Sequence, residues 1–98
     1  MSLAIIAITT HGLTVAGKLQ DNLKGDLYAP ENIINDNNAN ITAYETTTKK
    51  LIEKIWSRYN SFIFIMALGI VSRIIKDQIE NKFKDPAIVV VDEMGRYA

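Results

Sequence analysis

One unbroken apolar run, followed directly by a helical pattern, constrains the fold of this sequence more than any other feature. The run extends from Phe62 to Val71, and its first half is mostly aromatic and β-branched, with no polar alternation. This pattern is typical of a strand covered on both faces, as in a parallel sheet. The run is too short to cross a bilayer, so it predicts a core element and not a membrane helix. We therefore predict a buried strand over Phe62–Met66, a glycine-marked turn at Ala67, Leu68 and Gly69, and a helix that follows immediately and ends before Asp85 and Pro86.

Three more segments have strand patterns. The first is apolar without alternation, so we expect it to be central in the sheet. The second is short and is stopped by a proline, and the last is rich in valine. After the last one, a turn precedes the beginning of a further strand. In chain order these segments are Leu3–Thr9, Asp26–Ala29 before Pro30, Ala87–Val91, the turn Asp92–Gly95, and the strand start at Arg96 and Tyr97.

Apolar residues recur at helical spacing between these strands. Thr10 is a suitable N-cap for the first helix, and Gly25 ends that helix in the position usual for a left-handed C-cap. Thr46 to Thr48 can cap the second helix, where Trp56 is expected to pack in the core. The predicted inward positions are Leu13, Ala16, Leu19 and Leu23 in the first helix, Leu51, Ile52, Ile55, Trp56 and Tyr59 in the second, and Val71, Ile74, Ile75 and Ile79 in the third, with Lys50, Lys54 and Arg58 among the residues on the wet face of the second.

The segment 31–45 is rich in asparagine, which favours turns and local side-chain hydrogen bonds over regular structure. A stretch of this length without regular structure is unusual inside a small domain. It is either a mobile connecting loop or a lid over a site, and the pattern favours the plain loop.

Strands that alternate with helices predict the α/β class, as one domain over residues 1–98 with three α/β/α layers. The sheet is expected to be mostly parallel, with about four strands in the order 2-1-3-4, as in flavodoxin-like or Rossmann-like folds. That order reverses between the first and third strands. Ligands of such sheets bind at this switch point, outside the carboxyl ends of the strands.

Composition excludes several classes of function. Lysine plus arginine and aspartate plus glutamate balance at 11 each, so no nucleic-acid partner is indicated. The absence of cysteine excludes disulfides, thiolate zinc sites and cysteine nucleophiles, and a single histidine makes a metal cage in this domain improbable. The sequence does not open with a signal-peptide pattern, so a cytoplasmic location is expected.

The candidate catalytic residues are expected at the carboxyl edge of the sheet. His11 is the single histidine and the best general acid or base by its ordinary pKa, although it can equally serve as a helix-capping residue. Asp92 and Glu93 follow the last strand. Adjacent residues of an extended segment point to different sides, so one of these carboxylates at most is expected to act as a base or to orient a water molecule.

The candidate substrate-binding residues surround the same switch point. Helix starts at Thr10–Gly12 and at Leu68–Gly69 would offer free N–H groups to an anion or a developing oxyanion. Arg73, placed on the first turn of the third helix, and Arg96 could hold substrate carboxylates. The alternatives are an Arg73 paired with Asp77 and an Arg96 that is a plain strand-end charge. No phosphate-loop or dinucleotide fingerprint is present, which disfavours a flavodoxin-like mononucleotide module.

Three blocks of the sequence, AIIAITTHG, FIMALGIVSRII and DPAIVVVDEMGRYA, occur in the right order to resemble the amino-terminal domain of the CbiG family of cobalamin-biosynthesis proteins. The resemblance covers nearly the whole chain. Proteins of that family are longer, so it implies an amino-terminal domain of a larger protein. It also implies a hydrolase of anaerobic cobalamin (vitamin B12) biosynthesis that acts on the cobalt-corrinoid cobalt-precorrin-5A, opening its δ-lactone with release of acetaldehyde.

The same resemblance implies no cofactor, since cobalt would enter only as part of the substrate. These three blocks do not identify which residues of this sequence would be catalytic in the family. The alternative is a non-catalytic module that binds a tetrapyrrole or joins domains or copies of the chain. An unpaired edge beside the last strand would favour self-association of the fragment.

Overall fold

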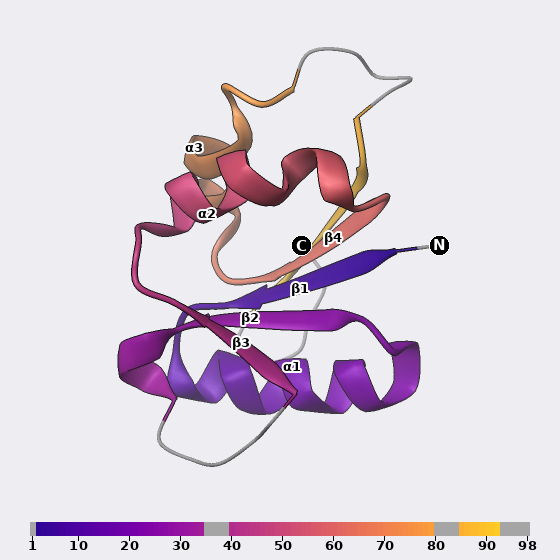
Figure 1. Cartoon of the computed structure of the whole chain (residues 1–98), viewed down its shortest axis with the longest axis vertical. Coiled ribbons are helices and arrows are strands. Elements are labelled where there is room, and N and C mark those ends of the chain that lie inside the picture. The colour runs from indigo at the N-terminus through magenta and orange to yellow at the C-terminus, as the bar shows by residue number, and fades with distance from the viewer. Residues whose placement is uncertain (1, 35–39, 80–84, 93–98) are drawn as a thin grey trace.

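A computed structural model describes residues 2–34, 40–79 and 85–92 of the chain. Its centre is a five-stranded sheet in which all the described pairings are parallel (Figure 1). The strands are β1 (Leu3–Ala7), β2 (Asp26–Pro30), β3 (Ile41–Tyr44), β4 (Ser61–Ile65) and β5 (Ala87–Val91), in the order β3-β2-β1-β4-β5. The predicted α/β class is confirmed, and so is the relative order of the four predicted strands. The count of four is wrong, because β3 adds a fifth strand beside β2.

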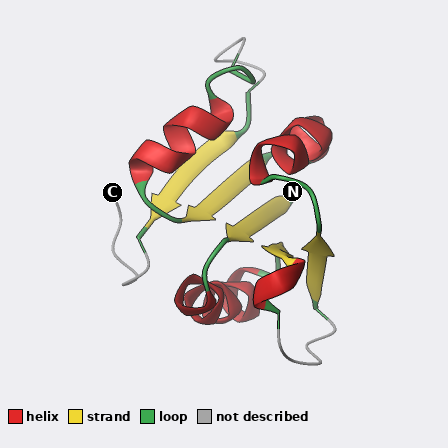
Figure 2. Ribbon diagram, turned by 90° about the vertical axis from the view of Figure 1, so that its left-hand side faces the viewer, coloured by secondary structure: helices red, strands yellow, loops and turns green. Residues whose placement is uncertain are grey.

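Helices cover both faces of this sheet (Figure 2). They are α1 (Thr10–Leu23), α2 (Thr48–Ile55), which continues as the short 3₁₀ turn η2 (Trp56–Arg58), and α3 (Leu68–Ile75). The alternation of side chains along β1 divides the core between the faces. Ala4 and Ile6 pack with residues of α2 and α3, whereas Ile5 and Ala7 pack with α1.

β4, the strand predicted from the unbroken apolar run, contributes buried residues to the core on both faces of the sheet. Phe62 and Phe64 are fully buried on the α2–α3 side, with ring centroids 5.8 Å apart, and Ile65 is fully buried on the α1 side. Trp56 stacks on Phe62 at a centroid distance of 5.3 Å. The core role predicted for Trp56 is confirmed.

The ends of α1 differ by one residue from the prediction. Thr9 is the N-cap, and its hydroxyl oxygen accepts a hydrogen bond from the Gly12 N–H at 2.9 Å. Thr10 is therefore not the cap but the first residue of the helix. At the other end Lys24, with φ 56°, adopts the left-handed conformation assigned to Gly25. Gly25 is buried instead, where an added β-carbon would lie 2.9 Å from the Leu3 side chain.

Two predicted inward residues are exposed. Leu23 is 50% exposed because it is the last residue of α1, where the chain turns away at Lys24. Ile79 is 54% exposed because α3 already ends at Ile75, so the helical spacing that pointed Ile79 inward no longer applies. The other predicted inward residues of α3 are buried.

The asparagine-rich segment contains regular structure that the sequence pattern did not predict. A 3₁₀ turn, η1 (Glu31–Ile33), follows β2, and β3 lies within the segment expected to be a loop. β3 pairs with β2 from Leu27↔Ile41 to Pro30↔Tyr44. Of its four residues only Tyr44 is buried, so an outer strand with little apolar surface gave no strand signal. The residues 35–39 between these elements lie outside the described part of the chain.

Candidate functional site

The carboxyl ends of β1, β4 and β5 meet at one edge of the sheet. Ile65 is in register with Ala7 of β1 and with Val91 of β5. Just beyond β4, the Met66 N–H donates to the Val91 carbonyl at 3.0 Å. The three sequence blocks therefore converge as predicted, on the switch point between β1 and β4.

The start of α1 packs directly on the end of β4. A β-carbon added to Gly12 would lie 3.4 Å from both the carbonyl oxygen and the Cγ2 atom of Ile65, and 3.0 Å from the Thr9 hydroxyl oxygen. The distances to Ile65 are ordinary contact distances, so a β-carbon at position 12 would mainly displace the Thr9 hydroxyl. A role of the Gly12 backbone in substrate binding stays a prediction.

The start of α3 is open. Ala67 is its N-cap and provides no side-chain hydrogen bond, and Leu68 and Ile70 beside it are 55% and 40% exposed. The predicted turn is shorter than expected, because Leu68 and Gly69 already belong to the helix. An added β-carbon on Gly69 would meet nothing within 4 Å, so neither space nor backbone conformation demands glycine there.

His11, the predicted general acid or base, and Arg73, a predicted carboxylate-binding residue, are both exposed. His11 is the second residue of α1, beside Thr10 at the switch-point edge. Arg73 lies in the last turn of α3 and not in the first, about 7.5 Å along the helix axis from Leu68. The alternative pairing of Arg73 is also wrong, since Asp77 forms its ion pair with Lys49 at 3.0 Å. The structure thus places Arg73 away from the open helix start.

Asp92 follows β5 at the same edge and is half-buried. Glu93 and Arg96 lie outside the described residues, as do most of the predicted turn Asp92–Gly95 and the strand start at Arg96 and Tyr97. The roles assigned to these residues therefore stay predictions.

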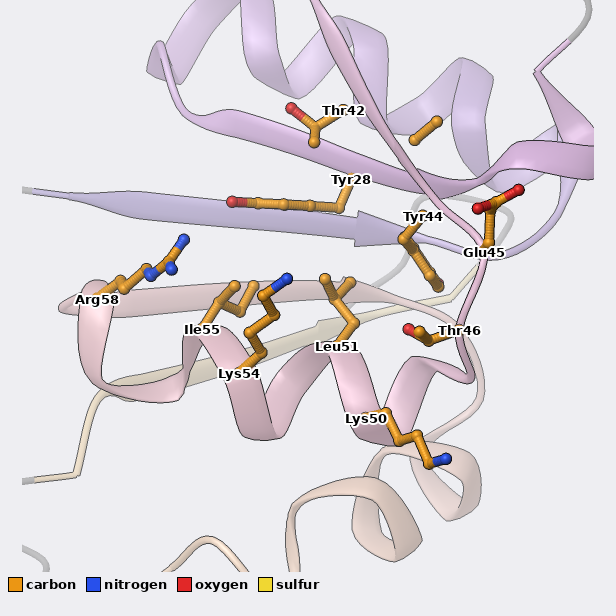
Figure 3. Close-up of a pocket in the computed structure, with 11 residues that line it drawn as sticks. Tyr28, Thr42, Tyr44, Glu45, Thr46, Lys50, Leu51, Lys54, Ile55 and Arg58 are labelled. Atoms are coloured by element: carbon orange, nitrogen blue, oxygen red, sulfur yellow. The ribbon is translucent and has the colours of Figure 1, made fainter.

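A second region, not predicted from the sequence, is a groove between α2 and the strands β2 and β3 (Figure 3). We call it the Tyr28 groove. Its volume is about 480 Å³, and buried apolar and aromatic side chains form part of its wall. The lining residues are Tyr28, Thr42, Ala43, Tyr44, Glu45, Thr46, Lys50, Leu51, Lys54, Ile55 and Arg58.

One end of the Tyr28 groove is cationic. Lys54 and Arg58 come from successive turns of α2 and η2, and in Figure 3 both charged groups extend toward the groove, whereas the amino group of Lys50 points away. Within the described residues no carboxylate forms an ion pair with any of these three cations. The sequence pattern placed them correctly on the polar face of the helix, but it gave no sign that this face borders a groove.

A chain of hydrogen bonds fixes Tyr28 in the groove. The Tyr59 hydroxyl donates to Asp26 Oδ2 at 2.6 Å, so the 2.7 Å contact between the Tyr28 and Tyr59 hydroxyls is donated by Tyr28. Burial, together with these hydrogen bonds, raises the pKa of Tyr59 far above its ordinary value. The Tyr59 phenol is therefore neutral near pH 7, and the Tyr28 oxygen keeps its lone pairs as acceptors.

The other end of the groove is anionic. Glu45 lies there, and it also borders a smaller depression lined by Glu31. A hydrogen bond with Glu45 and the charge of that carboxylate raise the pKa of Glu31. The two ends of the Tyr28 groove thus carry opposite charge.

The described residues contain no cluster of three or more histidine, cysteine, aspartate or glutamate side chains that could hold a metal ion. Within the same residues, every helix is too short or too polar to span a bilayer.

Three curated proteins similar to this chain are named for the same hydrolase activity. The chain is 30% identical over 95 residues to the cobalt-precorrin-5A hydrolase of Priestia megaterium and 27% identical over 96 residues to that of Salmonella typhimurium, covering 94% and 98% of this chain. A probable cobalt-precorrin-5A hydrolase of Methanocaldococcus jannaschii is 35% identical over 95 residues, or 95% of the chain. The chain spans only about a quarter of the length of these relatives, between 24% and 26%.

The fold is also found in a solved structure, a cobalamin biosynthesis protein G homolog from Sulfolobus solfataricus. It matches with a TM-score of 0.68 and 24% identity over 96% of this chain and 26% of that one. At this identity the match shows a shared fold. The family model described as Cobalamin synthesis G N-terminal matches residues 50–98, which run from α2 through β5. The chain therefore belongs to the cobalamin synthesis G N-terminal family.

Proposed function

We propose that this chain is the amino-terminal domain of a cobalt-precorrin-5A hydrolase of anaerobic cobalamin biosynthesis, acting in the cytoplasm. The observation that carries the proposal is sequence similarity. Over nearly its whole length, the chain is similar to three relatives that are named as cobalt-precorrin-5A hydrolases. The reaction would open the δ-lactone of the cobalt-corrinoid, with release of acetaldehyde. Cobalt would take part as a component of the substrate.

Lactone hydrolysis requires an activated water molecule and hydrogen-bond donors for the tetrahedral oxyanion. The open start of α3 supplies backbone donors at Leu68 and Gly69, and the exposed apolar side chains of Leu68 and Ile70 lie beside them. His11, at the start of α1 on the same edge of the sheet, is the group suited to proton transfer at neutral pH. Asp92 is a second candidate base at that edge.

A second candidate function is non-catalytic binding of a tetrapyrrole, with the chemistry performed by other parts of a longer protein. The observation that favours it is the exposure of both His11 and Arg73 at the surface of the described structure. A general acid–base group works best where water is excluded around the reacting atoms.

A chimera distinguishes these functions. The matching segment of the Priestia megaterium relative is replaced by this chain, and the product is incubated with cobalt-precorrin-5A while acetaldehyde is measured. Release at a rate comparable to the parent supports the hydrolase proposal. A folded chimera, verified by circular dichroism, that binds the substrate and releases no acetaldehyde contradicts it.

The same chimera carrying His11→Ala separates the two roles of the domain. A large loss of turnover with retained binding supports catalysis by this domain. Unchanged turnover in the His11→Ala chimera supports the binding module.

A further inference from the structure

The Tyr28 groove has the features of a binding site that the proposed chemistry does not use. It lies on the α2 face near the β3 edge of the sheet, whereas the switch point lies between β1 and β4. Its wall combines aromatic rings with two exposed cations at one end, and among the described residues neither cation forms an ion pair. Both cations are thus available to an anionic ligand.

The geometry points to the Tyr28 groove as a subsite for the carboxylate arms of a flat, apolar ligand, with Lys54 and Arg58 binding the carboxylates. This inference rests on the proposed function, because a carboxylated corrinoid is the ligand of this class that the reaction would supply. A guanidinium can bind a carboxylate through two parallel hydrogen bonds, and an ammonium adds a point charge beside it.

The neighbouring groups fit the same ligand. Leu51 and Ile55, which are almost fully buried, form the apolar floor of the groove next to the cations. In Figure 3 the Tyr28 hydroxyl lies at the Arg58 end of the groove. Because its proton is donated to Tyr59, the Tyr28 oxygen can accept a hydrogen bond from a cation and orient it without competing for the ligand.

The carboxylate of Glu45 at the other end of the groove favours one orientation of a bound ligand. Glu45 repels carboxylates from the carboxyl end of β3, so the anionic arms are directed toward Arg58. A hydrogen bond with Glu45 and the charge of that carboxylate raise the pKa of Glu31, so a second carboxyl group lies beside Glu45 at this end.

Binding of a carboxylated porphyrin tests the inference without any need for turnover. The probe is uroporphyrin, whose pyrrole rings each carry acetate and propionate arms, followed by fluorescence anisotropy on the 98-residue chain at low and high salt. The double variant Lys54→Gln/Arg58→Gln should raise the dissociation constant about tenfold, since exposed ion pairs each contribute modestly. The difference should shrink at high salt.

The matched control removes the same amount of charge elsewhere. Lys18→Gln/Lys76→Gln changes an exposed residue of α1 and the exposed C-cap residue of α3, neither of which lines the groove. It should leave the dissociation constant within about twofold, since long-range effects of exposed charges are screened. Equal weakening by both double variants would mean nonspecific attraction to cations and would overturn the inference.

Two further results would also overturn it. One is equal affinity for the methyl ester of the porphyrin, in which the carboxylates are neutral. The other is a set of amide chemical-shift changes confined to the switch point, near His11 and Gly69, with none near Thr42 and Lys54. These experiments measure binding and not turnover. The groove inference can therefore be overturned while acetaldehyde release still supports the hydrolase proposal. Equally, porphyrin can bind in the groove while the chimera releases no acetaldehyde.

Discussion

Gly12 lies so close to Thr9 that an added β-carbon would be 3.0 Å from the Thr9 hydroxyl oxygen, the oxygen that accepts the cap hydrogen bond of α1. The same β-carbon would be at an ordinary contact distance, 3.4 Å, from Ile65. We expect Gly12→Ala to lower the free energy of unfolding by about 1 kcal/mol, the usual cost of losing an N-cap, because the Thr9 side chain would have to shift. Urea denaturation followed by far-UV circular dichroism measures it. A variant as stable as the parent would show that the Thr9 side chain shifts at little cost.

Gly69→Ala is expected to have the opposite effect. Its β-carbon would occupy open space in α3, so the substitution should raise the free energy of unfolding by about 0.5–1 kcal/mol through helix propensity. Gly17→Ala is the matched control, because it also meets no neighbouring atom in a helix and lies in α1, beyond its first turn. If the start of α3 contacts the substrate, Gly69→Ala should weaken substrate binding by the chimera, whereas Gly17→Ala should not. Equal binding by both variants would argue against that contact.

His11→Ala should lower turnover of the chimera about a hundredfold or more if His11 is the general acid or base. Its melting temperature should remain nearly unchanged, because the His11 side chain is exposed and buries little apolar surface. Arg73→Ala serves as the comparison. From its place in the last turn of α3, it should affect the Michaelis constant at most. An active but destabilised His11→Ala variant would refute the assignment.

Tyr59 makes the stability of the chain sensitive to alkaline pH. Its folded-state pKa is raised by burial and by its hydrogen bonds with Asp26 and Tyr28, while in the unfolded chain it titrates near pH 10. Below pH 10 the phenol is neutral in both states, and its stabilisation is fully present. Above pH 10 the unfolded state releases the proton and the folded state keeps it, so the free energy of unfolding should fall as pH rises.

Tyr59→Phe should flatten this alkaline slope and cost about 1 kcal/mol near pH 7 for the lost hydrogen bonds. Some slope should remain, because burial also raises the pKa of Tyr44. Urea denaturation at several pH values between neutral and alkaline compares the two proteins. An unchanged slope in Tyr59→Phe would show that Tyr59 is not the titrating group.

The sequence predicted those strands whose composition is plainly apolar. β4 was found because a central parallel strand is apolar on both faces, and its run of aromatic and β-branched residues shows this. β5 was found from its valine-rich composition, although it is the outer described strand and only Val91 in it is buried. β3 was missed because its four residues lie in an asparagine-rich segment, so tertiary pairing with β2 and not its own composition makes it a strand. The start of α1 was misplaced by one residue because two adjacent threonines, Thr9 and Thr10, are both suitable N-caps.

The meeting of strand ends at the candidate site was predicted more accurately than the positions of the side chains around it. The convergence of the ends of β1, β4 and β5 follows from strand order alone, and it was correct. Arg73 was misplaced because the helix begins at Leu68, which moves position 73 to its last turn. The Tyr28 groove could not be foreseen, because it depends on a strand that the sequence did not reveal.

The pairing of β1 with β4 has a consequence for how the chain folds. Ser2 hydrogen-bonds to Asn60, 58 residues away, at the beginning of this central seam. β2 reaches β1 through one short helical crossover, but the other edge of β1 stays open until the segment Ser61–Ile65 arrives. Closing a loop of this length slows folding, and in the meantime a fully apolar strand edge is available to other chains. Refolding yield should therefore fall as protein concentration rises, even though the finished sheet has β1 at its protected centre.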